Sequence, residues 1–104
     1  MIRVGFRINP RGDTIGFNVD HHGDQIVCAA VSALAINTAN SIELLTQAKF
    51  SCEYENERFI DFRLVDKADA NARLLLKSLQ LGIHAIADEY PNELTIEEIS
   101  VSVD

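Results

Sequence analysis

Short segments in which every second residue is apolar alternate with two long segments of helical periodicity, and no other feature of the sequence constrains the fold as strongly. The segments of period two are expected to be strands, because successive side chains of a strand point to opposite faces of a sheet. They are residues 2–8, 15–19, 50–55, 60–64 and 94–103. Pro10 and Gly12 between the first two, and the short gap between the next two, predict two β-hairpins. Glu97 and Glu98 interrupt the alternation of the last strand, which predicts a bulge there.

The two long segments are predicted to be helices. Residues 26–47 contain neither Pro nor Gly, and residues 67–90 lie between Asp66, a candidate N-cap, and Pro91. In the second helix, one stripe is expected to face the core (Leu75, Leu79, Ile83, Ile86, Tyr90) and the opposite stripe to face water (Arg73, Lys77, Gln80, His84, Asp88). The order β-β-α-β-β-α-β predicts an α+β fold, a five-stranded sheet with two long helices. A chain of this length is expected to form a single domain over residues 1–104.

The first helix offers more apolar surface than one face of such a sheet can cover. One stripe is expected to meet the sheet: Val31, Leu34, Ala35, Ile42 and Leu45. A second lies away from it: Ile26, Ala29, Ala33, Ile36 and Leu44. Either the second helix or a partner subunit must therefore cover the second stripe.

Charge and composition exclude several classes of partner. Sixteen acidic against nine basic side chains give a formal net charge of −7 without a cluster of Lys and Arg, so direct nucleic-acid binding is not expected. The first residues alternate as a strand and do not resemble a secretory signal, and no uninterrupted apolar run approaches about 18 residues, so no membrane span is expected. A cytoplasmic protein with reduced Cys28 and Cys52 is predicted. The spacing of His and Cys does not suggest a metal, and no cofactor is expected.

Residues suited to chemistry gather between a strand end and a helix start. His21 and His22 precede a short loop, and Cys28 falls in the first turn of the helix that follows. The N–H groups and the positive dipole end at a helix start favour the nucleophilic thiolate, although an inert core thiol and solvated His side chains fit the same spacing. Ser32, one turn beyond Cys28, could support such a site or bond back to its own helix. Cys52 is expected in the core.

Two stretches of this region carry a resemblance to a known family. Residues 26–34, IVCAAVSAL, resemble almost letter for letter the helix start of the Prp ribosomal-processing cysteine proteases, and residues 16–22, GFNVDHH, resemble the strand leading to the His of that family. Length and element order agree along the whole chain. Three positions depart from the pattern: Asp20 replaces Gly, His22 replaces Ala, and Gln25 replaces an Asp of many members. The change at Asp20 could alter the turn, because Gly alone accepts positive φ freely.

The resemblance implies a cysteine endopeptidase that removes the N-terminal extension of a large-subunit ribosomal protein, the twenty-seventh. It assigns Cys28 as nucleophile and His21 as base. The additional His22 of this chain is the alternative base, and Ser32, one turn beyond Cys28, could support the site. Backbone N–H groups at the helix start would hold the oxyanion. The family also implies a homodimer. The alternative is a non-catalytic, homodimeric, ribosome-associated binding module in which Cys28 merely packs; a redox-sensing thiol lacks a resolving Cys nearby.

Overall fold

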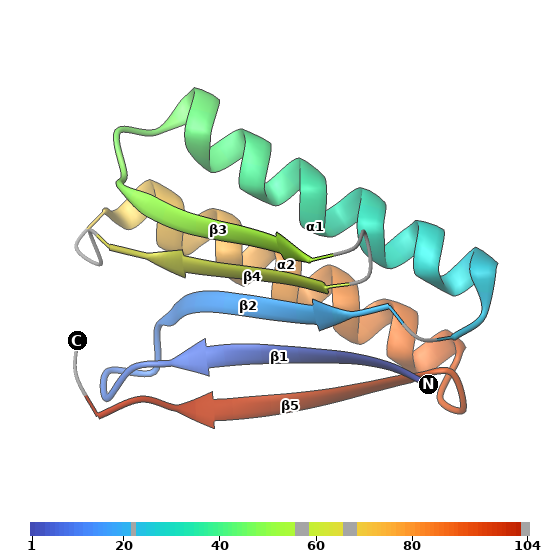
Figure 1. The fold of residues 1–104 in the computed structure, drawn as a ribbon. Coiled ribbons are helices and arrows are strands. Elements are labelled where there is room, and N and C mark those ends of the chain that lie inside the picture. The colour runs from blue at the N-terminus through green and yellow to red at the C-terminus, as the bar shows by residue number, and fades with distance from the viewer. Residues whose placement is uncertain (22, 56–58, 66–68, 103–104) are drawn as a thin grey trace.

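The chain folds as one five-stranded sheet with two helices (Figure 1), and the structure, a computed structural model, describes residues 1–21, 23–55, 59–65 and 69–102. The elements are β1 Ile2–Ile8, β2 Thr14–Asp20, α1 Gln25–Leu45, β3 Phe50–Glu55, β4 Phe59–Leu64, α2 Ala70–Glu89 and β5 Leu94–Ser100. The predicted α+β order and the two hairpins are confirmed.

The strands are arranged in the order β3-β4-β2-β1-β5. Neighbours are antiparallel except β1 and β5, which run parallel from Ile2 opposite Leu94 to Ile8 opposite Ser100. This ladder has no register shift at Glu98, so the predicted bulge in β5 is wrong. The alternation changes there because Glu98 faces the helices and accepts a hydrogen bond of 3.3 Å from Gln80 Nε2. The irregularity lies instead in the β1–β2 pairing, between Arg7 and Ile8.

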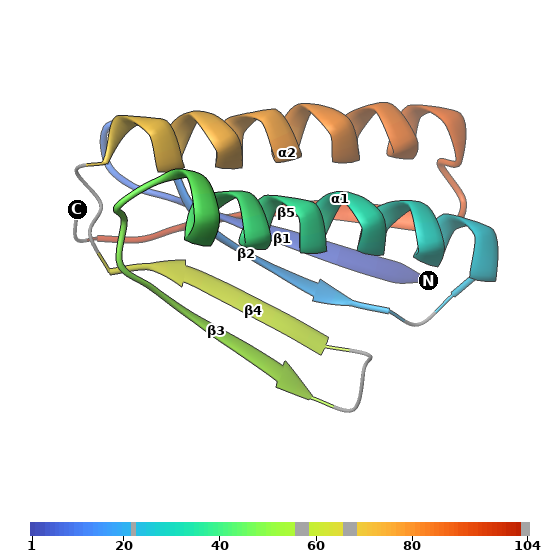
Figure 2. The ribbon, with the colours of Figure 1, turned by 90° about the horizontal axis from the view of Figure 1, so that it is seen from above.

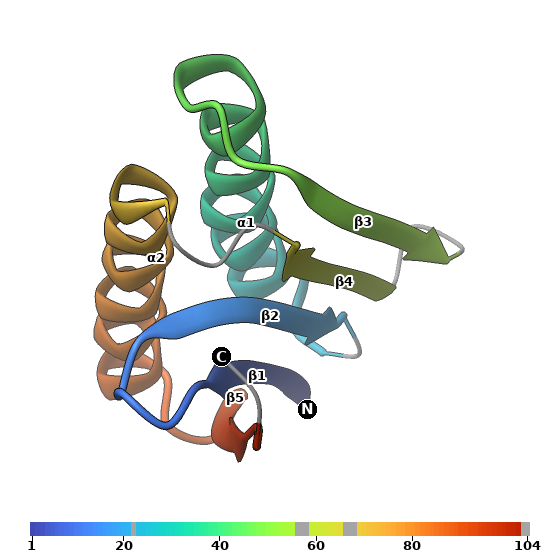
Figure 3. The ribbon, with the colours of Figure 1, turned by 90° about the vertical axis from the view of Figure 1, so that its left-hand side faces the viewer.

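Both helices cover the same face of the sheet (Figures 2 and 3), and the core lies between the two layers. Phe62 of β4 is at its centre and stacks on Phe17 and Phe50, with ring centroids 5.3 and 5.0 Å away. The helices approach each other closely at Gly82, where a Cβ would lie 2.9 Å from Leu34 Cδ1. The described residues leave the opposite face of the sheet open.

Some predicted details of the helices are wrong. Asp69 caps α2 and accepts a hydrogen bond from the Ala72 amide, whereas the predicted cap, Asp66, and the predicted start at residue 67 lie outside the described residues.

The exposure of three helix residues also differs from the prediction. Gln80 of the predicted wet stripe is buried, and Thr14 Oγ1 satisfies its Oε1 by donating a hydrogen bond of 2.6 Å. Tyr90 is exposed because it lies beyond the last turn, and Leu45 is exposed at the end of α1. His84 faces solvent as predicted.

By length and composition alone, α1 could cross a membrane, although it is not an uninterrupted apolar run. Core helices of soluble proteins meet the same criterion. Val27, Val31, Ala35 and Ile42 of α1 are buried within this fold, as expected for a helix that packs on a sheet.

Candidate active site

The segment between β2 and α1 forms a sharply capped helix start. Asp24 is the N-cap, and its Oδ1 accepts hydrogen bonds from the amides of Ile26 at 2.9 Å and Val27 at 3.1 Å. The Cys28 amide donates to the Asp24 carbonyl at 2.8 Å, so the helical ladder has begun at this residue. Asp is among the preferred N-cap residues because its short carboxylate reaches these otherwise unpaired donors. The predicted position of Cys28 in the first turn is therefore observed.

The structure brings His21 against Ser32, eleven residues further along the chain. Ser32 Oγ lies 2.8 Å from His21 Nε2 in a partly buried hydrogen bond. His21 directly follows β2, and Ser32 lies one turn beyond Cys28 in α1. The loop therefore returns the chain so that an imidazole rests beside the helix that carries the thiol. Of the two explanations for Ser32, the contact favours support of the imidazole over bonding back to its own helix.

Cys28 is half-buried and lies against the edge of the core. Its Sγ donates a weak hydrogen bond to the Gly23 carbonyl at 3.7 Å. Gly23 itself packs closely on the start of β1, where a Cβ would lie 2.9 Å from Ile2 Cγ1 and 3.3 Å from the Ile2 nitrogen. A larger residue would push this loop off β1 and move the carbonyl that receives the thiol. The sequence pattern did not reveal this role of Gly23, because it depends on a contact with Ile2 at the start of β1.

The helix-start amides are less available than the sequence suggests. Those of Ile26, Val27 and Cys28 all donate to Asp24, so an oxyanion would have to compete with this cap for them. The change from Gly to Asp20 does not disturb the strand, since Asp20 pairs regularly with Arg3 and Phe59. The second candidate base, His22, lies outside the described residues.

Other candidate groups are separate from this site. Cys52 lies on β3, half-buried as a free thiol, and burial raises the pKa of its side chain. Such a shift keeps a thiol protonated and poorly nucleophilic at neutral pH. Among the described residues, no group of three or more His, Cys, Asp or Glu side chains is placed to hold a metal ion.

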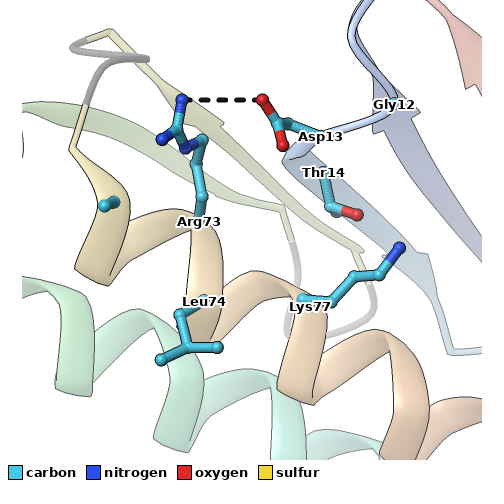
Figure 4. Close-up of a pocket in the computed structure, with 7 residues that line it drawn as sticks. Gly12, Asp13, Thr14, Arg73, Leu74 and Lys77 are labelled. Atoms are coloured by element: carbon cyan, nitrogen blue, oxygen red, sulfur yellow. Dashed lines mark ion pairs between the residues drawn. The ribbon is translucent and has the colours of Figure 1, made fainter.

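A hollow of about 290 Å³ lies between the β1–β2 turn and the first turns of α2 (Figure 4). An ion pair of 3.5 Å between Arg73 and Asp13 lies at its rim, and Lys77 also lines it. The turn is fixed by Asn9, whose side-chain oxygen accepts hydrogen bonds from two turn amides, and by Gly12 at φ 83°. This hollow is at the end of the sheet where β2 begins, whereas His21 follows the end of β2. It is therefore remote from the Cys28 region.

The chain is similar in sequence to known proteins. The family model described as cysteine protease Prp matches residues 1–95. The ribosomal processing cysteine protease Prp of Staphylococcus aureus is 28% identical over 103 residues, covering 92% of this chain and 97% of the relative.

Solved structures show the same fold. The crystal structure of an essential ribosomal processing protease Prp from S. aureus, in complex with a covalently linked product peptide, has a TM-score of 0.89 and 27% identity. The match covers 95% of this chain and all of that one. A crystal structure of a Streptococcus mutans protein has a TM-score of 0.85 and 25% identity, covering 97% and 99% of the two chains. The chain thus belongs to the Prp family and is a cysteine protease.

Proposed function

We propose that the chain is a ribosomal-processing endopeptidase in which Cys28 is the nucleophile, His21 the general acid and base, and Ser32 the residue that orients the imidazole. The observation that carries the proposal is the hydrogen bond of 2.8 Å between Ser32 Oγ and His21 Nε2, formed one helical turn from Cys28. Membership of a cysteine protease family favours this function over a non-catalytic binding module.

The proposed reaction begins when the Cys28 thiol transfers its proton to the imidazole and attacks the carbonyl carbon of the scissile bond. The imidazolium of His21 protonates the departing amine, and a thioester between Cys28 and the N-terminal part of the substrate remains. His21 then removes a proton from water, which attacks the thioester and releases a carboxylate and the thiol.

The oxyanion of each tetrahedral intermediate requires donors near the helix start. The Ile26 and Val27 amides point toward Asp24 Oδ1 and would serve if the substrate oxygen displaced one of these bonds. The positive end of the α1 dipole favours negative charge on both the thiolate and the oxyanion. The cap and the catalytic intermediates would thus compete for the same amides.

The proposed substrate is the precursor of a large-subunit ribosomal protein, the twenty-seventh, from which an N-terminal extension is removed. The support is the name of the S. aureus relatives, which are ribosomal processing proteases, and the peptides bound in their crystal structures. A cytoplasmic location is proposed with this substrate, because ribosomes mature there and thiols stay reduced.

Incubation with a peptide copying the extended N-terminus, followed by mass analysis of the products, tests this function. The expected result is two fragments from a single cut with the parent chain and none with Cys28→Ala, which keeps a small side chain but has no nucleophile. Cleavage by Cys28→Ala within tenfold of the parent rate would overturn the nucleophile assignment. A parent chain that leaves the peptide intact but cuts another would overturn only the substrate.

The proposed active form is a homodimer joined through the second apolar stripe of α1. In the single chain, Ile26 and Leu44 at the ends of this stripe are 73% and 78% exposed, and Ile36 between them is 42% exposed. Ala29 and Ala33 are also exposed, and such small residues allow two helices to approach closely. The monomer alternative requires α2 to cover these side chains, but they are exposed in the single chain. Light scattering after gel filtration would refute the dimer if the mass matched a single chain of 11.5 kDa.

A further inference from the structure

β3 is an edge strand whose two sides differ in chemistry. It pairs with β4 on one side and ends the sheet on the other, so the backbone N–H and C=O groups along its outer edge have no ladder partner among the described strands. Ser51, Glu53 and Glu55 point to the open face of the sheet, and all three are exposed. An extended peptide can add to such an edge through main-chain hydrogen bonds, with side chains on alternate sides supplying specificity.

The helix-facing side of the same strand is apolar. Phe50 stacks on Phe62, and Cys52 packs against the core beside it. Tyr54 completes this side and is 59% exposed, which is a large aromatic surface to leave in water. An added strand would therefore find apolar neighbours on one side and two carboxylates on the other.

The edge lies close to the catalytic end of the sheet. Tyr54 is in register with Ile60 of β4, which in turn pairs with Val19 of β2, two residues before His21. Adjacent strands are separated by about 4.8 Å, so a strand added to β3 would lie three spacings, about 14 Å, from β2. An extended chain covers about 3.4 Å per residue, so at least about four residues would connect the added strand to the scissile bond.

We infer that the outer edge of β3 is a docking site for an extended peptide of alternating basic and apolar residues, a flank of the substrate that adds a sixth strand. The basic side chains lie opposite Glu53 and Glu55, and the apolar ones cover Tyr54 and Cys52. Opposite charges on cross-strand neighbours stabilise such pairing, whereas like charges oppose it. Only the identification of this peptide as substrate rests on the proposed function.

A second copy of the chain fits this edge poorly. In an antiparallel β3–β3 pair, the open-face residues of both copies meet, so carboxylates of Glu53 and Glu55 would lie opposite one another. The other edge of the sheet also fits poorly, because Glu98 of β5 points to the helix-facing side and is held by Gln80. A charge that points inward at an edge opposes strand addition. Charge complementarity therefore favours a basic peptide over a second copy of the chain, and favours the β3 edge over the β5 edge.

Binding of a peptide without any cleavage tests the docking site independently of catalysis. The probe is a blocked synthetic peptide of four Lys-Val repeats, titrated into ¹⁵N-labelled protein at physiological salt, with four Glu-Val repeats as the control peptide. We expect shift changes and slowed amide exchange concentrated on residues 50–55 with the Lys-Val peptide alone. Absence of binding, or changes centred on α1 or β5, would overturn the inference. Glu53 and Glu55 would then be explained as charges that prevent edge-to-edge pairing of β3 with a second copy.

Paired charge reversals separate local recognition from overall attraction. Glu53→Lys/Glu55→Lys is expected to weaken binding of the Lys-Val peptide at least tenfold and to permit binding of the Glu-Val peptide. Glu89→Lys/Glu97→Lys changes the net charge equally at exposed positions of α2 and β5, and should alter affinity less than twofold. Equal losses in the two variants would show a non-local charge effect and refute docking on β3. Failure of the chain to cleave any ribosomal peptide would overturn the proposed function and leave this binding result unaffected.

Discussion

The contact between Ser32 and His21 leads to a quantitative prediction for Ser32→Ala. Ser32 Oγ and His21 Nε2 lie 2.8 Å apart in a partly buried position, and a typical hydrogen bond within a protein contributes about 1 kcal/mol net. If this energy holds the imidazole in its reactive orientation, its loss lowers kcat by a factor of about five, since about 1.4 kcal/mol corresponds to tenfold. KM should change little, because Ser32 is assigned no contact with substrate.

Ser32→Ala should lower stability only slightly. Loss of the bond costs about 1 kcal/mol, and the preference of a helix for Ala over Ser, a few tenths of a kcal/mol, offsets part of it, so the melting temperature should fall by a few degrees. Because parent and variant are both folded at an assay temperature well below melting, a fivefold loss of kcat beside this small shift separates a positioning role from a structural one.

Peptide cleavage by Ser32→Ala, His21→Ala and the double variant measures whether the two residues act as a unit. His21→Ala should lower kcat by a factor on the order of 10² or more, the usual contribution of general acid–base catalysis. With no imidazole to orient, the second substitution should add nothing in the double variant. The reasoning fails if Ser32→Ala keeps kcat within twofold of the parent, or if the two losses multiply in the double variant.

Three further outcomes are expected. His21→Ala should slow cleavage more than His22→Ala, and the reverse ranking in initial-rate measurements would transfer the role of base to His22. Asp24→Ala removes a cap with two amide bonds and should cost about 1 kcal/mol, or a fall of roughly 5 °C in the melting temperature by calorimetry, whereas Asp24→Asn should lose much less. In a Cys28→Ser background, iodoacetamide should label Cys52 slowly at neutral pH and faster as the pH rises, because burial raises its pKa and only the thiolate reacts; rapid labelling at pH 7 would contradict this.

The strand and helix order was predictable because it depends on local periodicity. Each strand alternates between a buried and an open face. Only the bulge predicted in β5 was wrong, because Glu98 occupies a regular, helix-facing position. That position is tolerable because Gln80, eighteen residues earlier, supplies a donor, and Gln80 is in turn buried by its bond to Thr14. A polar residue within a helix normally indicates a wet face. Its partners come from β2 and β5, so this burial could not be predicted from the helix alone.

The candidate site was predictable to different extents. The position of Cys28 in a first turn follows from neighbouring residues, so sequence spacing was enough. The contact between His21 and Ser32 requires the loop to reverse and return the imidazole to the second turn of α1. Spacing alone left two explanations for Ser32, and only the folded chain favours one of them. The occupancy of the Ile26 amide by the Asp24 cap was likewise invisible in the pattern.

The geometry of α1 allows dimerisation and catalysis to proceed on different sides of one helix. At about 100° per residue, Ser32 lies roughly 40° around the axis from Cys28, so both belong to one side. Ile26 and Leu44 each lie roughly 160° from Cys28 by the same measure, on nearly the opposite side. A partner subunit packed on these exposed ends of the stripe would therefore leave the thiol accessible to a peptide arriving from elsewhere. The apolar surface of α1 beyond a single stripe then has two separate causes: burial against the sheet and the proposed subunit contact.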